Sequence, residues 1–349
     1  MQIDTEKLRS LLDEAVASGE ESACQLAIYQ SGKLIADIHA GENIRSDTLF
    51  PVYSVSKGLT AVLAHILCEE GKLDFDAPVA EYWREFGCKG KENIKVWHIF
   101  SHRSGLFQMP LLEHFSDQAN WQKMIGYMQK AVPQDPGGKC RYHGITFGWL
   151  AGEVIARAGQ KQFKDLFAEK ITEPLQISRE WFFGTDAEAE TRLVLPVMSR
   201  YEDFSDWRTV FINDQQIRSG CIPSANGIGS ARAIARVYAA LSGNGVNGVR
   251  LLKDETIRKA VQSRRAADDP LPEGISKWAH FGLGWALAGS PENPGAIFGH
   301  GGALGSEGFA IPELELSVAF TKNKFNATHP VHPLRNRISE VLNIKCRNW

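Results

Sequence analysis

The sequence predicts an α+β fold in which an antiparallel sheet is flanked by helices and a mainly helical lobe is inserted. Two short apolar runs within residues 25–38 surround a Ser-Gly pair, which is the pattern of a β-hairpin. Alternating strand patterns return only after residue 280, whereas the middle of the chain is richer in helical stretches and loop signals. Both ends of the chain would therefore build one body, from residues 1–73 and 220–349. Residues 74–219 would form a lobe, with a cleft between the two parts.

The individual elements follow from the spacing of apolar residues. A first helical stripe runs from Leu8 to Ala15, and a second covers residues 57–70, where Gly71 stands at the position of a C-cap. Further helices are expected over residues 147–158, 163–170 and 334–342. Late strands are expected over residues 281–285, 296–298, 308–311 and 316–321, separated by turns at glycine or proline.

Composition limits the classes of function. The 349 residues are 43% apolar, which is enough for a sizeable core, and the formal net charge of −2 offers no basic surplus for nucleic acid. No stretch approaches the roughly 18 consecutive apolar residues of a membrane span. The N-terminus lacks the cationic start and apolar run of a signal peptide, and the six cysteines are scattered without a C-x-x-C pair. We therefore expect reduced thiols and a cytoplasmic protein; the pattern predicts no particular oligomeric state.

One short motif carries candidate chemistry. Residues 54–57 read Ser-Val-Ser-Lys at the start of the second predicted helix, so Ser54 and Lys57 would lie on one face, one turn apart. Burial and the helix dipole disfavour a charged lysine there, and a neutral amine can take the serine proton. The free backbone N–H of Ser54 could face a developing oxyanion. The alternative is an N-cap serine followed by an exposed lysine.

Two further segments could complete a site. Tyr142 precedes the predicted helix over 147–158 and could project into the cleft as a second base, or it could simply pack. Residues 298–303, Phe-Gly-His-Gly-Gly-Ala, end a predicted strand with small residues that would let a substrate approach, or they could form an ordinary glycine-rich turn. His98 and His102 lack the acidic or cysteine companions of a metal site, so we predict no metal and interpret the second histidine as part of a structural turn that supports the cleft.

Taken together, these motifs carry a family resemblance. The S-x-x-K, Y-x-x and H-G-G motifs at residues 54–57, 142–144 and 300–302 occur in the order and at the spacing of the superfamily of class C β-lactamases, DD-peptidases and family VIII carboxylesterases. The chain resembles this superfamily over roughly residues 24–325, including the segment His-Ile-Phe-Ser-His-Arg-Ser-Gly-Leu at 98–106. The resemblance implies a β-lactamase/transpeptidase-like fold and serine-based chemistry.

The resemblance also implies a role for each matched residue. Ser54 would be the nucleophile, and Lys57 and Tyr142 would share the proton transfers, with the identity of the base left open. The oxyanion hole would use the backbone N–H groups of Ser54 and Ala303. His300 stands where the family often has lysine, and it would contact a substrate carboxylate or form a hydrogen bond with Tyr142.

The remaining substrate-binding positions depart from the family pattern. Gly144 replaces the asparagine of Y-x-N, and Gly301, followed by Gly302, replaces the threonine of K-T-G. Both changes remove polar groups that a β-lactam or a D-alanyl peptide would use. The resemblance therefore implies a carboxylesterase that forms an acyl-enzyme on Ser54 from a small-molecule ester or amide, without metal or organic cofactor. The alternatives are a β-lactamase or D-amino-acid peptidase on the same fold, and a non-catalytic binding homologue.

Overall fold

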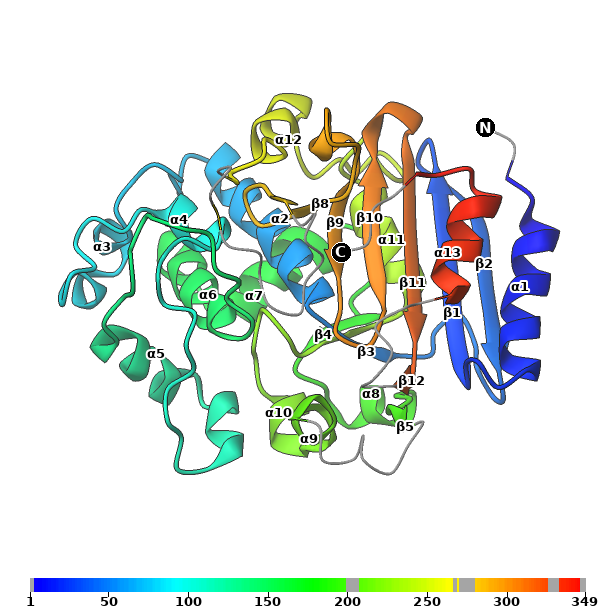
Figure 1. Ribbon diagram of the computed structural model, residues 1–349, viewed down its shortest axis with the longest axis horizontal. Coiled ribbons are helices and arrows are strands. Elements are labelled where there is room, and N and C mark those ends of the chain that lie inside the picture. Colours follow the sequence, from blue (N-terminus) through cyan, green and yellow to red (C-terminus); the bar gives the residue numbers. More distant parts are fainter. Residues whose placement is uncertain (1–2, 199–206, 266–268, 270–279, 326–332, 346–349) are drawn as a thin grey trace.

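A seven-stranded antiparallel sheet forms the centre of the computed structural model, which describes residues 3–198, 207–265, 269, 280–325 and 333–345. Its strands, in spatial order, are β2 (Lys33–Gly41), β1 (Ala23–Gln30), β11 (Leu316–Lys322), β10 (Glu307–Ile311), β9 (Phe298–Gly301), β8 (Ala286–Leu287) and β7 (His280–Phe281). Every neighbouring pair is antiparallel. Strands from the two ends of the chain thus lie side by side at β1 and β11 (Figure 1), and the predicted α+β fold is confirmed.

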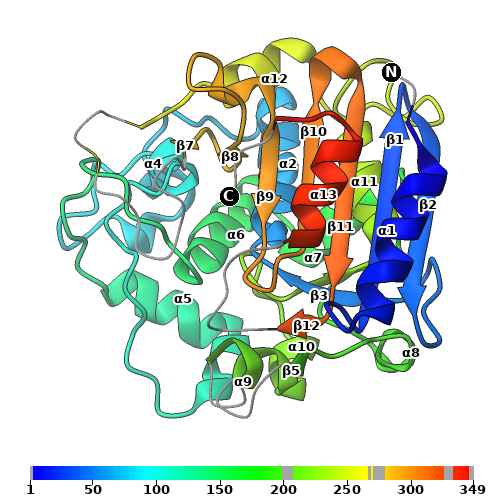
Figure 2. The ribbon, with the colours of Figure 1, turned by 45° about the vertical axis from the view of Figure 1, so that its right-hand side comes forward.

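Alternation along the strands separates two apolar layers. In β1, Leu26 and Ile28 face the N-terminal helix α1 (Thr5–Ala17) and the C-terminal helix α13 (Pro333–Val341). Ala27 and Tyr29 face the other side, where α2 (Val55–Glu69) and α11 (Ala231–Ala239) pack. Figure 2 shows α1 and α13 together on one face of the sheet, with α2 and α11 behind it. The helices predicted at residues 8–15, 57–70 and 334–342 are confirmed as α1, α2 and α13.

The middle of the chain is mainly helical, as predicted, but it also contributes strands. Its helices, with the one that follows α11, are α3 (Val79–Tyr82), α4 (Val96–Phe100), α5 (Trp121–Lys130), α6 (Thr146–Gly159), α7 (Phe163–Phe167), α8 (Ala187–Thr191), α9 (Trp207–Asn213), α10 (Gln215–Ser219) and α12 (Asp254–Ala260). A small antiparallel sheet has the order β3 (Phe50–Tyr53), β6 (Gly227–Gly229) and β4 (Trp181–Phe183), and β5 (Val197–Met198) pairs in parallel with β12 (Lys324–Phe325). The division into body and lobe at residues 73/74 and 219/220 stays a prediction.

The predicted strand over residues 281–285 is wrong. The chain instead makes a tight turn between β7 and β8, in which the Gly282 N–H donates to the Trp285 carbonyl (2.9 Å). Gly284 adopts a φ of 89° and donates its N–H to the carbonyl of Phe100 in the helical part (2.8 Å). The alternation of glycine with large apolar residues resembled a strand because all of these positions are buried. Similarly, the strand expected over 296–298 begins only at Phe298.

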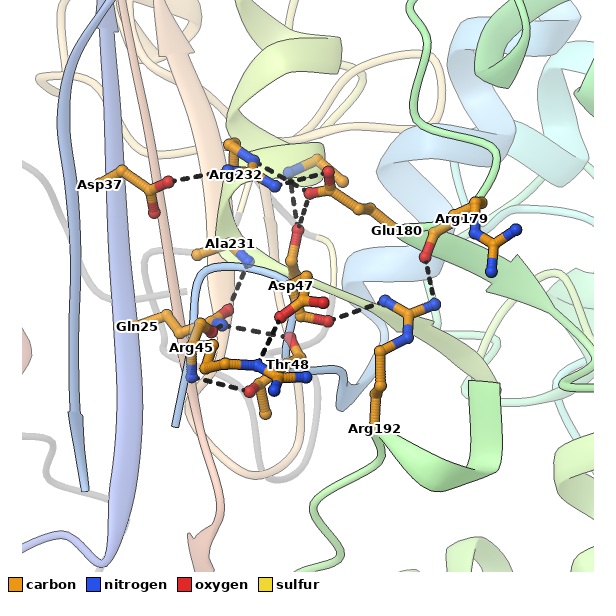
Figure 3. A network of polar contacts seen from close by, with 12 residues as sticks. Gln25, Asp37, Arg45, Asp47, Thr48, Arg179, Glu180, Arg192, Ala231 and Arg232 are labelled. Atoms are coloured by element: carbon orange, nitrogen blue, oxygen red, sulfur yellow. Dashed lines mark hydrogen bonds and ion pairs between the residues drawn. The ribbon is translucent and has the colours of Figure 1, made fainter. Parts of the chain in front are cut away.

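A polar network holds the segment that leads into β3 (Figure 3). Gln25 of β1 donates to the carbonyl of Thr48 (3.1 Å) and accepts the N–H of Ala231 at the start of α11 (2.9 Å). Arg232, the next residue, forms an ion pair with Glu180 just before β4 (2.7 Å). The network therefore joins the large sheet, the small sheet and the residues immediately before Ser54.

Helix α2 packs against α11 so closely that only glycine fits at position 58. A Cβ at Gly58 would lie 2.1 Å from the Tyr238 hydroxyl oxygen. That hydroxyl is fully buried, and among the described residues it has no hydrogen-bond partner. An unsatisfied buried hydroxyl costs about 1–3 kcal/mol, so this contact is tight but not optimised.

We expect opposite stability effects on the two sides of this contact. Tyr238→Phe should raise the free energy of unfolding by about 1 kcal/mol because it removes the unpartnered hydroxyl. Gly58→Ala should lower it by about 1–3 kcal/mol through overpacking. In urea titrations the double variant should be more stable than the sum of the two changes predicts, because the clashing oxygen is gone. Strict additivity would contradict this account of the contact.

Candidate active site

Ser54 lies on a sharp turn from β3 into α2. The preceding residue, Tyr53, has a φ of 47°, a left-handed conformation that costs a bulky residue about 1–3 kcal/mol. Its hydroxyl donates to the carbonyl of Arg208 (2.8 Å), and the Ser56 hydroxyl donates to its carbonyl. The N–H of Gly227 in β6 donates to the same Ser56 oxygen (2.9 Å). These contacts hold the strained turn, and Ser54 stands at the N-cap of α2 without using its side chain as a cap.

Lys57 is completely buried one turn along the helix, so the alternative of an exposed lysine is wrong. Its Nζ lies 3.0 Å from Ser54 Oγ, and it donates to the backbone carbonyls of Gly144 (2.7 Å) and Ser224 (2.9 Å). Carbonyl oxygens only accept, so these two bonds use two N–H groups of the lysine. A neutral amine held in this way keeps one lone pair, and the serine hydroxyl is the remaining neighbour that can donate to it.

Burial sets the charge of this lysine. Desolvation is the sole cause that lowers the pKa of Lys57 well below its ordinary value of 10.5. No carboxylate within the described part of the chain forms an ion pair with it to oppose this shift. Burial therefore favours the uncharged amine, which is the form able to accept the proton of Ser54.

Tyr142 meets the same hydroxyl from the other side. Its own hydroxyl forms a hydrogen bond with Ser54, and Lys57 Nζ lies 5.0 Å from the centre of its ring. The ring stacks on Phe281 with centroids 5.8 Å apart. Burial raises the pKa of Tyr142 above its ordinary value of 10, and the bond to Ser54 offsets this only in part. The phenol therefore keeps its proton at neutral pH.

Two histidines support the tyrosine. His102, at a φ of 61°, accepts the N–H of His143 on Nδ1 (3.2 Å), and its ring centroid lies 4.7 Å from that of Tyr142. His143 donates from Nδ1 to the Arg141 carbonyl (2.6 Å) and accepts the Ser104 hydroxyl on Nε2 (2.7 Å). Burial lowers the pKa of His143 to about 4, so it is neutral. The structural turn predicted at residues 102–104 is thus present.

The end of β9 closes the site. A Cβ at Gly302 would lie 2.2 Å from the carbonyl oxygen of Val52, so glycine is required where this turn meets β3. The adjacent Ala303 and the nucleophile candidate Ser54 share one property: within the described residues, neither backbone N–H donates a hydrogen bond. Free donors on neighbouring segments are what an oxyanion hole needs, and this role stays a prediction.

His300 does not form the hydrogen bond with Tyr142, one of the two contacts expected of it, and its contact with a substrate carboxylate stays a prediction. Its Nδ1 lies 2.7 Å from the carbonyl oxygen of Gly301. Its Nε2 is buried and has no hydrogen-bond partner in the described part of the chain, so the hydrogen bond to Tyr142 is not formed. The two ring centroids are 6.1 Å apart. Burial is the largest cause that lowers the pKa of His300 to about 3.

Gly144 leaves open space beside the catalytic candidates. Its carbonyl holds Lys57, as described above, but an added Cβ would meet no atom within 4 Å. At this position a backbone oxygen therefore holds the lysine, and a Cβ would have open space around it.

Sequence reasoning missed two parts of this site. It did not identify the carbonyl of Ser224 as a partner of Lys57, because a backbone oxygen leaves no trace in residue type. It also missed the left-handed Tyr53, because nothing local favours that conformation for tyrosine.

No metal cluster or membrane helix accompanies the site in the residues that the structure describes. Groups of three or more histidine, cysteine, aspartate or glutamate side chains placed to hold a metal ion do not occur there. His98 accepts the backbone N–H of Lys95 on Nδ1 (3.0 Å), within its own helix start. None of the helices in the same ranges has the length and apolar character needed to span a bilayer.

Comparison with known proteins extends over nearly the whole chain. The family model described as Beta-lactamase matches residues 8–342. The chain is similar to "Esterase/beta-lactamase LipL" of Mycobacterium tuberculosis, with 30% identity over 341 residues, 86% of this chain and 76% of that protein. It is also similar to the solved structure of a family VIII carboxylesterase, with 26% identity, a TM-score of 0.86, and coverage of 98% and 99% of the two chains. A penicillin-binding protein homologue from Caulobacter crescentus has 25% identity and a TM-score of 0.83, covering 97% of this chain and 96% of the other. The resemblance seen in the sequence is confirmed.

The buried lysine should make stability depend on pH with a definite sign. In the unfolded chain Lys57 has an ordinary pKa of about 10.4 and binds a proton between pH 7 and 10. In the folded protein burial lowers that pKa, so the folded state binds fewer protons over this range. The free energy of unfolding should therefore rise with pH, by up to about 1.4 kcal/mol per pH unit from this group.

In urea titrations, the free energy of unfolding of the wild type should rise relative to that of Lys57→Met as the pH increases from 7 to 10. Lys33→Met, which removes an exposed lysine, is the control and should show no such trend. If the difference in free energy of unfolding between wild type and Lys57→Met does not change with pH, the lysine is charged in the folded protein.

Proposed function

This chain belongs to the beta-lactamase family of serine hydrolases, and on that premise we propose that it is a carboxylesterase that hydrolyses small esters through an acyl-enzyme on Ser54. The observation that carries the proposal is the buried amine of Lys57, 3.0 Å from Ser54 Oγ. A non-catalytic homologue has no need to bury a lysine against a serine, because such burial is costly. This geometry therefore supports an enzyme rather than a binding protein.

The proposed reaction has two steps. Ser54 Oγ attacks the ester carbonyl carbon while its proton passes to Lys57 Nζ, and the carbonyl oxygen becomes an oxyanion facing the N–H groups of Ser54 and Ala303. The intermediate collapses, the bond to the alcohol breaks, and the alcohol oxygen takes a proton from Tyr142 or from the lysine ammonium. Water then attacks the carbonyl carbon of the acyl-enzyme and gives a proton to the same basic groups. Ser54 Oγ takes a proton back as it leaves, which frees the acid and restores the serine.

The absence of polar side chains at two substrate-binding positions favours ester substrates over β-lactams. Gly144 and Gly301 present no side-chain polar group to a substrate amide, and such groups discriminate strongly when they are present. The solved carboxylesterase that the chain resembles points the same way. The second candidate activity is β-lactam hydrolysis, because the similar Mycobacterium tuberculosis protein is named an esterase/beta-lactamase.

We further propose a cytoplasmic location and a small-molecule substrate. Five cysteines of the described residues are free thiols, and two of them, Cys24 and Cys140, are buried in apolar surroundings. Unpaired thiols are typical of proteins from reducing compartments. Fractionation of cells that express the protein at its natural level would test this location.

Ser54→Ala should abolish turnover of 4-nitrophenyl acetate, with kcat reduced by about 10³-fold or more. It should leave the protein folded and lower the free energy of unfolding by about 1–3 kcal/mol at most, because Lys57 and Tyr142 lose the hydroxyl but no capping hydrogen bond is lost. A fluorophosphonate should add its mass to the peptide that contains Ser54. The control is Ser10→Ala, which removes an exposed hydroxyl of α1 and should change neither readout. Full activity of Ser54→Ala, or a label on another serine, would refute the assignment.

Gly144→Asn should shift selectivity toward amide-containing substrates. A Cβ at this position would meet no atom within 4 Å, so we expect the fold to be unaffected. One added hydrogen bond of about 1.4 kcal/mol would raise the ratio of kcat/KM for nitrocefin over 4-nitrophenyl acetate by about tenfold. Gly144→Ala supplies the Cβ without the amide and should leave the ratio near that of the wild type. Equal shifts in the two variants would show that volume, not polarity, sets selectivity here.

A further inference from the structure

We infer that Thr60 and Ser224 are positioning residues for the reaction, because their hydroxyls hold in place the two segments whose carbonyls orient the Lys57 amine toward Ser54. Each of the two residues acts through the lysine and not on the substrate itself. The inference rests on the proposed function, in which Lys57 takes the proton of Ser54.

The direction of the lysine lone pair depends on hydrogen bonds. A lysine amine rotates about its last carbon–nitrogen bond unless its hydrogens are held. Lys57 Nζ donates one hydrogen to the carbonyl of Gly144 (2.7 Å) and another to the carbonyl of Ser224 (2.9 Å). When both hydrogens of a neutral amine are held in this way, its lone pair has a single remaining direction. The two carbonyls therefore decide whether that lone pair faces Ser54 Oγ, 3.0 Å from the nitrogen.

Ser224 ties these two carbonyls to each other. They belong to segments that lie 87 and 167 residues from Lys57 in the chain, so the sequence does not fix their spacing. The Ser224 hydroxyl donates to the carbonyl of Ile145, the residue after Gly144 (2.7 Å). Ser224 thus gives its own carbonyl to the lysine, and its side chain holds the segment that supplies the other carbonyl.

Thr60 ties the same segment to the helix that carries the lysine. It lies three residues after Lys57 in α2, on the same face of the helix. Its hydroxyl donates to the carbonyl of Pro223, the residue before Ser224 (2.7 Å). Helix α2, residues 223–224 and residues 144–145 are therefore joined by a closed set of hydrogen bonds around the amine.

The surroundings of these hydroxyls are tightly packed. Thr60 and Ser224 are both fully buried. A Cβ at Gly148 of α6 would lie 2.6 Å from Ser224 Oγ and 2.8 Å from the Ser224 backbone nitrogen. Helix α6 thus presses directly on this segment. Loss of either hydroxyl should let the segment shift, and the amine would then lose its fixed direction.

Thr60→Val and Ser224→Ala test the inference by removing one hydroxyl each. The rate at which a fluorophosphonate labels Ser54 should fall roughly tenfold or more in both variants, because the lone pair is no longer held toward the serine. With 4-nitrophenyl acetate, kcat and kcat/KM should fall together while KM stays unchanged, because the carbonyls act on proton transfer and not on substrate binding.

Two controls separate positioning from stability. Thr60→Ser keeps the hydroxyl and should be labelled at close to the wild-type rate. Ser317→Ala removes an equally buried hydroxyl that donates to the carbonyl of Ala235 (2.8 Å) and joins β11 to α11. It should lower the urea midpoint about as much as Ser224→Ala, yet leave the labelling rate unchanged. If Ser224→Ala fails to fold, Thr60→Val against Thr60→Ser decides, and equal rates in that pair would overturn the inference.

Failure of the inference and failure of the proposed function give different results. If the wild type hydrolyses the ester and is labelled at Ser54, but Thr60→Val and Ser224→Ala behave like Ser317→Ala, the esterase assignment stands and the inference is wrong. If the wild type is labelled at Ser54 without hydrolysing the ester, the esterase assignment is wrong, and the labelling rates still decide the inference. If Ser54 is not labelled at all, the inference is overturned together with the nucleophile assignment.

Discussion

The structure depends on one constraint: a lysine amine must be held without water against a serine hydroxyl. Lys57 satisfies it by donating to the carbonyls of Gly144 and Ser224, which come from two segments that are distant in the sequence. Neither carbonyl brings a charge, so the amine can stay neutral rather than pair with a carboxylate. The helix α2, the start of α6 and the segment before β6 must therefore pack together before the site exists at all.

The energy for this arrangement comes from the surrounding fold. A left-handed tyrosine precedes the nucleophile candidate, and such strain persists only where neighbouring contacts over-determine the backbone. Ser56 ties the turn to β6, and the network around Gln25 ties the preceding segment to the large sheet and to α11. The two sheets thus act as one support for a single residue, which explains why strands from both ends of the chain are needed.

Few charged or polar side chains surround the Ser54 hydroxyl. Tyr142, His143 and His300 are neutral, because burial raises the pKa of the phenol and lowers the pKa of the imidazoles. Glycine occupies positions 144 and 301, where the family pattern has polar side chains. A site built in this way can transfer protons at the reacting oxygen but offers few fixed groups to a charged substrate. This chemistry supports the proposed hydrolysis of small neutral esters.

The sequence by itself determined the local features: the first hairpin, the helical stripes, and the one-turn separation of Ser54 and Lys57, all of which depend on the period of a helix or strand. It identified Tyr142 and His300 only through their order along the chain. It misjudged residues 281–285, because buried glycine and apolar residues alternate in a turn as they do in a strand. Only the tertiary structure decided that Lys57 is buried and which carbonyls hold it. These properties depend on contacts between segments far apart in the chain, and residue type and spacing do not encode such contacts.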